Sequence, residues 1–185
     1  MSGSDSDREE YVYVLDYMPS GRSSDRASDE PLIQGLGTDG FTLLEVVPRT
    51  DADVTIGDRV YVGDEERERV ERVKQRIDYD DLTEGSKTEL DYAVEDIVEQ
   101  QEERFVEFFK EAGSVTIRMH QLDLLPGVGE KIRNTIIEER KYEDFETYED
   151  LEEHISGFHD PEGVLVDRIL QEIRDEDVKY KLFVR

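Results

Sequence analysis

The chain has 185 residues and no cysteine, which excludes a disulfide framework and a thiolate metal site. Its 49 acidic residues outnumber 23 basic ones, giving a formal net charge of −26, and arginine outnumbers lysine 16 to 7. No apolar run reaches membrane-spanning length and the start of the chain is polar, so we expect a cytoplasmic protein that does not bind membranes.

The acidic excess, with few lysines, is similar to that of proteins from extreme halophiles, whose acidic surfaces stay hydrated in molar salt. The alternative is an acidic protein of ordinary salt that binds a basic partner. Net charge informs on solubility and partners and does not determine the fold.

The N-terminal third reads as an arm followed by a small sheet. Residues 1–10 are rich in Ser, Asp and Gly and are predicted to form a disordered arm. Strand patterns follow within residues 11–64, at 11–17, 31–36, 41–47 and 57–63. Short strands joined by Gly-containing turns predict a small antiparallel β-barrel, although a generic antiparallel sheet would show the same pattern.

Beyond residue 64 the apolar spacing changes to three and four residues, which predicts linking helices over 65–112. We expect them near 64–76, 86–101 and 102–112, with a short turn at 79–84. Residues 113–178 then predict two linked hairpins. The first has a helix-like segment over 115–124, a glycine turn, and a helix running to Tyr142. The second has a helix starting at Thr147, a turn with Gly157, and a helix over 161–173. The tail, residues 179–185, is basic and β-prone, and either adds a strand to the barrel or caps the helical part.

The turn Gly127-Val128-Gly129 is the most informative motif of the chain. The first turn of a helix carries N–H groups without intrahelical partners, and the helix dipole favours an anion there. Glycines let another backbone approach closely, so a phosphodiester oxygen can accept hydrogen bonds from the turn, with Lys131 adding charge. The alternative is a tight connection that serves packing alone.

Residues 114–142 hold five basic and four acidic side chains, whereas residues 143–177 hold two basic and fourteen acidic ones. The first hairpin is thus the long segment that has no excess of acidic residues. Four of its basic residues either flank bound phosphates or pair with neighbouring acids: Arg118, Arg133, Arg140 and Lys141.

A second candidate surface lies on the barrel, where aromatic and guanidinium groups are mixed as in base-stacking surfaces. Its members are Tyr11, Tyr13, Arg22, Arg49, Arg59 and Tyr61, and the alternative is core or edge packing. The three histidines do not have the spacing of a metal site. No nucleophile–base pair or phosphate-loop signature is present, so we do not expect an enzyme.

The hairpin region resembles tandem helix-hairpin-helix proteins, through residues 127–129, Arg140-Lys141, Phe145 and Asp150-Leu151. The whole chain after residue 10 resembles the archaeal domain-of-unknown-function 655 family, in a haloarchaeal-type form. The matching stretches are 16–22, 41–49, 61–64, 103–106, 122–129, 136–141 and 179–183. The resemblance implies an α+β protein, with a barrel resembling oligonucleotide-binding folds followed by an all-α tandem helix-hairpin-helix domain. It also implies nucleic-acid binding, most often supposed to involve RNA.

We therefore expect a non-enzymatic protein that grips a nucleic-acid backbone through the first turn without base specificity, with RNA favoured over DNA. No cofactor is expected. Family behaviour allows a Na⁺ or K⁺ ion at carbonyl oxygens of the first turn, although no sequence feature demands one. The alternative function is an adaptor that docks on a ribosomal or on a replication or repair complex and uses the hairpin as a scaffold. The sequence leaves the oligomeric state open.

Overall fold

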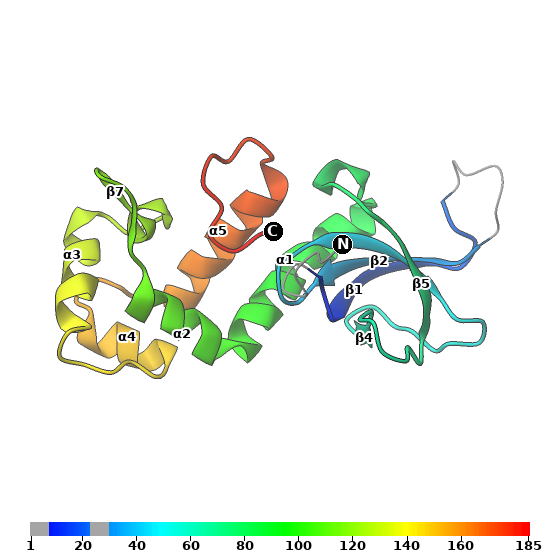
Figure 1. Cartoon of the computed structure of the whole chain (residues 1–185), viewed down its shortest axis with the longest axis horizontal. Helices are drawn as coiled ribbons and strands as arrows, with labels where there is room; N and C mark the ends of the chain where they lie inside the picture. The colour runs from blue at the N-terminus through cyan, green and yellow to red at the C-terminus, as the bar shows by residue number, and fades with distance from the viewer. Residues whose placement is uncertain (1–7, 23–29) are drawn as a thin grey trace. The chain divides into compact units, whose positions relative to one another are not determined.

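The computed structural model describes residues 8–22 and 30–185. Most of the predicted arm over 1–10 lies outside the described residues. The chain divides into two compact units. The first runs to Ala93 and also contains Phe183–Arg185, and the second is Val94–Leu182. Strands dominate the first unit and helices dominate the second, which confirms the α+β class (Figure 1).

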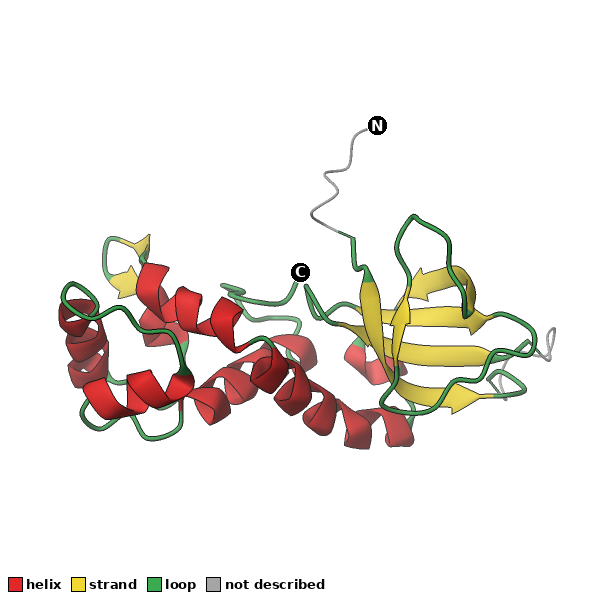
Figure 2. Cartoon of the chain, turned by 90° about the horizontal axis from the view of Figure 1, so that it is seen from below, coloured by secondary structure: helices red, strands yellow, loops and turns green. Residues whose placement is uncertain are grey.

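The first unit is built on a curled, five-stranded antiparallel sheet (Figure 2). Its strands are β1 (Tyr11–Met18), β2 (Leu32–Gly37), β3 (Leu43–Pro48), β4 (Arg59–Tyr61) and β5 (Val70–Arg76). Their order across the sheet is β4-β1-β2-β3-β5, so that β4 and β5 are its two ends within the described residues. The predicted strands at 11–17, 31–36, 41–47 and 57–63 are confirmed, and the sheet core consists mainly of buried valines on one face.

The prediction of a helix over 64–76 is wrong, and so residues 65–112 are not all linking helices. Strand β5 occupies 70–76, and its apolar spacing of three residues imitates a helix because of a β-bulge. Val70 lies opposite Pro48 and Val73 opposite Val46, so three steps along β5 match two along β3. The bulge lets both β5 valines pack on the sheet core despite their odd spacing.

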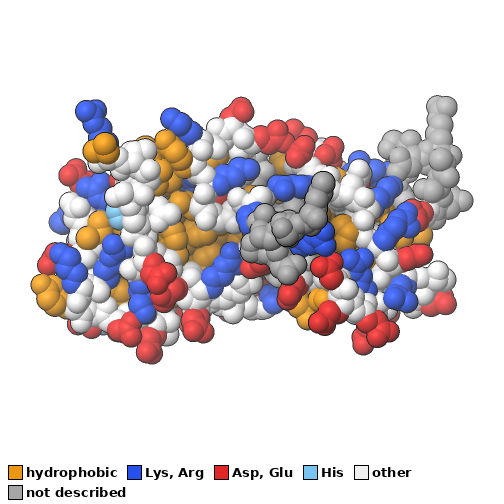
Figure 3. All heavy atoms as spheres, in the orientation of Figure 1, with side chains coloured by type: hydrophobic (Ala, Val, Ile, Leu, Met, Phe, Trp, Pro, Cys, Tyr) orange, Lys and Arg blue, Asp and Glu red, His pale blue; other side chains and the backbone are white. Residues whose placement is uncertain are grey.

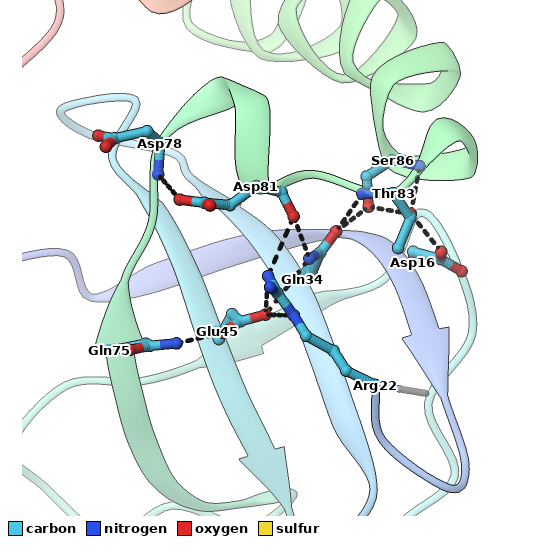
Figure 4. Close-up of polar contacts among 9 residues, drawn as sticks. All are labelled: Asp16, Arg22, Gln34, Glu45, Gln75, Asp78, Asp81, Thr83 and Ser86. Carbon is cyan, nitrogen blue, oxygen red and sulfur yellow. Dashed lines mark hydrogen bonds and ion pairs between the residues drawn. The ribbon is translucent and has the colours of Figure 1, made fainter. Parts of the chain in front are cut away.

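A buried polar network fixes the segment after β5 on the sheet (Figure 4). The carboxylate of Glu45 is fully buried and accepts hydrogen bonds from Arg22 Nε at 2.8 Å and Gln75 Nε2 at 2.6 Å. Gln34 donates to Glu45 and accepts from Ser86 Oγ at 2.7 Å. This network holds η2 (Tyr79–Asp81) and the start of α1 (Glu84–Gln100) against β2 and β3. The predicted short turn and the helix after it are both present.

Two segments from opposite ends of the described chain meet the turn between β2 and β3. Glu9 is buried, and its carboxylate accepts from the N–H groups of Asp39 at 2.9 Å and Gly40 at 2.7 Å. Arg185 pairs with Asp39 at 2.5 Å, and its N–H donates to the Gly40 carbonyl oxygen at 2.9 Å. Glu9 is therefore ordered, contrary to the predicted arm. No strand is present in 179–185, all of which the structure describes.

The second unit contains the end of α1 and four further helices. They are α2 (Glu102–Glu111), α3 (Glu130–Glu139), α4 (Tyr148–His154) and α5 (Pro161–Arg174). The helices predicted from Thr147 and over 161–173 are confirmed, and Thr147 caps α4 as expected by accepting from the Asp150 N–H.

The helix-like segment predicted over 115–124 is wrong in its first half. Residues 114–120 form a small hairpin of β6 (Ser114–Thr116) and β7 (Met119–His120), and only η3 (Gln121–Leu124) is helical. Gln121 closes the hairpin, because its N–H donates to the Gly113 carbonyl oxygen and its side chain accepts from the Gly113 N–H. Ile117 lies in the turn between the two strands and is fully exposed, so its side chain does not contribute to a helical apolar face.

Candidate nucleic-acid interface

The turn between η3 and α3 has the geometry of a tight connection. The Val128 N–H donates to the Leu125 carbonyl oxygen at 3.2 Å, and both side chains are buried. Gly127 has φ = +84°, a conformation that residues with a Cβ adopt only with strain. Gly129 is the N-cap of α3, with φ = −83° and ψ = 179°. Leu125 and Val128 thus anchor the turn, while the two glycines lie exposed between and after them.

The backbone donors at the start of α3 have no partner among the described residues. The first intrahelical bond runs from Arg133 N–H to the Gly129 carbonyl oxygen at 2.9 Å, and no side chain caps the helix. The N–H groups of residues 130–132 are left over, as the helix geometry requires. A Cβ placed on Gly129 would meet no atom within 4 Å, so the approach to these donors is open.

The second turn, between α4 and α5, has the same backbone hydrogen bond and glycine conformation as the first, but the N-terminus of its helix is capped. The Phe158 N–H donates to the Ile155 carbonyl oxygen at 3.1 Å, and Gly157 has φ = +85°. Here, however, the carboxylate of Asp160 caps α5 by accepting from the Gly163 N–H at 3.0 Å. Pro161, the first residue of α5, has no N–H to offer. Only the first turn therefore leaves its helix N-terminus open.

The two turns pack reciprocally on each other's helices. A Cβ on Gly127 would lie 3.9 Å from Cγ2 of Val164 in α5, and a Cβ on Gly157 would lie 3.9 Å from Cγ1 of Ile132 in α3. Each glycine turn thus approaches the first turns of the opposite helix. The contacts between the two turns are therefore reciprocal.

The structure separates the predicted basic residues into two groups. Lys131 and Arg118 are exposed, and neither side chain has an ion-pair or hydrogen-bond partner in the described part of the chain. Lys131 is the second residue of α3, whereas Arg118 lies at the tip of the β6–β7 hairpin. On the face in Figure 3, basic side chains are visible among acidic ones over α3 and β7.

The other three basic residues are occupied by internal contacts. Arg133 Nη1 lies 2.9 Å from Asp123 Oδ1. Arg140 Nη1 donates to the carbonyl oxygens of Phe109 at 3.2 Å and of Ala112 at 2.7 Å, and so satisfies the C-terminus of α2. Lys141 forms an exposed pair with Glu138 at 3.0 Å.

Asp123 and His120 fix η3 by a reciprocal cap. The His120 N–H donates to Asp123 Oδ2 at 2.9 Å, and His120 Nδ1 accepts from the Leu122 N–H at 3.1 Å. Partial burial alone would favour the protonated acid, but the His120 N–H and the Arg133 guanidinium outweigh it and lower the pKa of Asp123. Burial, followed by the positive charge of Arg140, lowers the pKa of His120. The cap therefore consists of an ionised carboxylate and a neutral imidazole.

A buried ion pair that the sequence analysis missed supports the turn. Arg168 and Glu172 of α5 are 5% and 1% exposed, and their Nε and Oε2 atoms lie 2.8 Å apart. Arg168 Nη1 donates to the Leu124 carbonyl oxygen at 3.1 Å, directly before the turn. Arg168 also donates to the Tyr180 carbonyl oxygen, and Glu172 accepts from the Leu182 N–H. The available signal was an Arg–Glu pair four residues apart in an otherwise apolar helix face.

The predicted barrel surface is only partly brought together. Tyr11 and Tyr61 are paired residues of β1 and β4 whose ring centroids lie 5.4 Å apart. Tyr13 is buried and donates to Glu89, and Arg22 belongs to the network around Glu45. The remaining two residues are Arg49, exposed after β3, and Arg59, half-buried in β4.

A family model described as "Protein of unknown function (DUF655)" matches residues 8–185, which is nearly the whole chain. The chain belongs to the DUF655 family. One relative is the uncharacterized protein MJ0038 of Methanocaldococcus jannaschii, which is 42% identical over 178 residues, 96% of this chain and 80% of the relative.

A solved structure of the DUF655 family supports the fold described above. The crystal structure of Af1531 from Archaeoglobus fulgidus is similar to this chain with a TM-score of 0.86 and 47% identity. The match covers 96% of this chain and 100% of the Af1531 chain. Both relatives are archaeal proteins.

Two further observations concern the described residues of this DUF655 chain. They contain no group of three or more His, Asp or Glu side chains that could hold a metal ion. None of their helices combines the length and the apolar character needed to cross a membrane.

Proposed function

We propose that this protein is a non-enzymatic RNA-binding protein that grips a phosphate backbone at the N-terminus of α3. The observation that carries the proposal is the difference between the two turns. Both have a glycine at positive φ and the same anchoring hydrogen bond, but only the first has an open, uncapped helix N-terminus. A phosphate oxygen would accept from N–H groups at the start of α3, as the Asp160 carboxylate accepts from the Gly163 N–H at the start of α5.

The surroundings of the first turn agree with an anionic ligand. Lys131 and Arg118 are free to approach phosphates, while Asp123 is neutralised by Arg133. Glu130 is exposed at the start of α3 and opposes a bound anion, although Arg133 Nη2 lies 3.9 Å from it. Because these contacts are to backbone donors and cations, binding would not depend on base sequence.

In this proposal, the second unit is a tandem helix-hairpin-helix domain in which η3 takes the place of the first helix of the first hairpin. In the same reading, the curled sheet is an oligonucleotide-binding-type barrel opened between β4 and β5. We favour RNA over DNA because the resemblance noted in the sequence points to RNA. A haloarchaeal origin and a cytoplasmic location complete the proposal, and both rest on composition.

Gly129→Asp tests the proposal, because it copies the cap that Asp160 provides to α5. Aspartate is a better N-cap than glycine by a few tenths of a kcal/mol, so the variant should be at least as stable as the wild type. Its carboxylate would occupy the phosphate position. Loss of hydrogen bonds to a charged group, roughly 1.5–3 kcal/mol each, should weaken RNA binding by about tenfold or more.

The matched control is Gly113→Asp, which adds the same charge in the same unit at a position where a Cβ also meets no atom within 4 Å. Fluorescence anisotropy with labelled RNA and DNA of one sequence, single- and double-stranded, gives the affinities. Equal RNA affinity of a folded Gly129→Asp protein and the control would refute the proposal. Protein partners that survive nuclease treatment in a pull-down would favour the adaptor function instead.

A further inference from the structure

A cavity of ≈ 760 Å³ lies in the first unit, lined by residues from strands β1, β3 and β5 and from the end of β4 onward. We call it the seam cavity, because β4 and β5 are the two ends of the curled sheet and do not pair with each other in the described part of the chain. Its volume is in the range of small-molecule sites. It is distinct from the turn before α3, which belongs to the second unit.

One wall of the seam cavity is aromatic and held in place. Tyr61 Oη accepts a hydrogen bond from the Glu65 N–H at 3.0 Å. Gly63 packs so closely on this ring that a Cβ there would lie 2.3 Å from Tyr61 Oη. Tyr11 contacts Tyr61 edge to face, with an interplanar angle of 67°, and is 45% exposed. The exposed ring of Tyr11 in the cavity thus packs against the ring of Tyr61, which is fixed in place.

Leu44 and Val73 also line the cavity and are only partly buried. They lie on β3 and β5, where they pack against the edge of the sheet core. With the tyrosines, they make a surface suited to a planar, largely apolar ring. Aromatic side chains in such a setting stack on nucleobases of any sequence.

Three arginines line the same cavity, and each uses only part of its guanidinium within the protein. Arg8 forms an exposed pair with Asp64 at 3.1 Å, a kind of contact that contributes little to stability. Arg67 donates through Nε to the Gly63 carbonyl oxygen at 2.7 Å, and Arg76 donates through Nη2 to the Arg185 carbonyl oxygen at 2.6 Å. Since a guanidinium has five N–H donors, donors remain for a phosphate.

Four acidic side chains line the cavity beside the three arginines, and two of them are engaged within the protein. Glu9 lines it, but its carboxylate is occupied by backbone N–H groups of the β2–β3 turn. Asp64 is the partner of Arg8, and the other two acids are Glu10 and Glu65.

We propose that the seam cavity binds a nucleotide, with its base against Tyr11, Leu44 and Val73 and its phosphate directed to the arginines. The nucleotide is either free or part of a single strand. The inference goes beyond the proposed function and stands without it, because it uses no residue of the first turn.

Adenosine 5′-monophosphate is the probe, titrated into the full chain and followed by ligand-observed NMR, with adenosine and inorganic phosphate measured in parallel. Tyr11→Leu should weaken its binding roughly fivefold to a hundredfold, the range for losing one base–aromatic stack. Tyr92→Leu is the control, since Tyr92 is 61% exposed on α1 and does not line the cavity. The monophosphate should bind more tightly than adenosine, and this difference should shrink as salt rises.

Unchanged affinity in a folded Tyr11→Leu protein, or equal affinity for adenosine and its monophosphate, would overturn the proposal. Gly129→Asp should leave the affinity for the monophosphate unchanged, so failure of this site and failure of the first turn are distinguishable. In that variant, a short adenine-rich RNA that displaces the monophosphate supports a single-strand ligand. A lack of displacement supports the free nucleotide.

Discussion

The guanidinium of Arg168 donates a hydrogen bond to the carbonyl oxygen of Leu124 across 44 residues of sequence. Leu124 is the last residue of η3, and the glycine turn begins directly after it. A buried cation of α5 therefore binds the backbone at the point where the first turn starts. Glu172 compensates the charge of Arg168 and also accepts from the Leu182 N–H at 2.9 Å.

Arg168→Met should destabilise the protein strongly, because it leaves the carboxylate of Glu172 buried without its cation. We expect a loss of about 3–5 kcal/mol in the free energy of unfolding. The double variant Arg168→Met/Glu172→Met should recover much of this loss. Urea unfolding of both single variants and the double variant measures the coupling, and purely additive losses would show that the pair does not act as a unit.

Gly127→Ala should lower stability by about 1 kcal/mol or more, since a Cβ is unfavourable at φ = +84°. Gly157→Ala, at φ = +85°, should cost a similar amount. Gly113→Ala is the control, because Gly113 has no positive φ and its Cβ would have open space. Urea midpoints give the comparison, and equal midpoints for Gly127→Ala and Gly113→Ala would contradict the strain argument.

The protein should lose stability as the pH falls below about 6.5, the ordinary pKa of histidine. The pKa of His120 is lowered in the fold, so the unfolded chain takes up the proton first and is favoured by acid. Protonation would also remove the Nδ1 acceptor of the Leu122 N–H. The free energy of unfolding, measured from about pH 7 to pH 5, should change less with pH for His120→Gln than for the wild type. Parallel curves for the two proteins would exclude His120 as the source.

The salt dependence of RNA binding should identify the basic residues that meet phosphate. For single-stranded RNA, removing one phosphate contact lowers the slope of log affinity against log salt by about 0.7. Lys131→Ser and Arg118→Ser should each show this change. Lys141→Ser should show a smaller one, since Lys141 is paired with Glu138. A steeper loss for Lys141→Ser would place the ligand elsewhere.

Thermal stability should rise with potassium chloride, because screening weakens the mutual repulsion implied by a net charge of −26. A series of melting curves at increasing salt tests this expectation. A melting temperature that falls with salt would argue against the halophilic assignment.

Local signals in the sequence were sufficient for most of the fold. The β-branched runs around Val12 and Val46 indicated strands, and Thr147 indicated the start of α4. Strand β5 was missed because its bulge turns a two-residue period into a three-residue one. No single-sequence pattern predicts such a bulge, since it depends on the partner strand.

The candidate site was less predictable from the sequence than the fold was. Gly127 and Gly129 could be recognised because their spacing is local to one turn. The separation of free Lys131 from occupied Arg133 and Arg140 could not, because it depends on acceptors such as Asp123 that only the folded chain brings near. Arg168 shows the same limit, as its partner Leu124 lies on another element.

The assignment of Phe183–Arg185 to the sheet unit has a consequence for biosynthesis. While the ribosome is still translating the helices, the β2–β3 turn lacks the contacts of Asp39 and Gly40 with Arg185. The contacts of this turn are complete only once Arg185 has been synthesised. A fragment truncated after Ala93 lacks these contacts and should therefore be less stable than the first unit within the full chain.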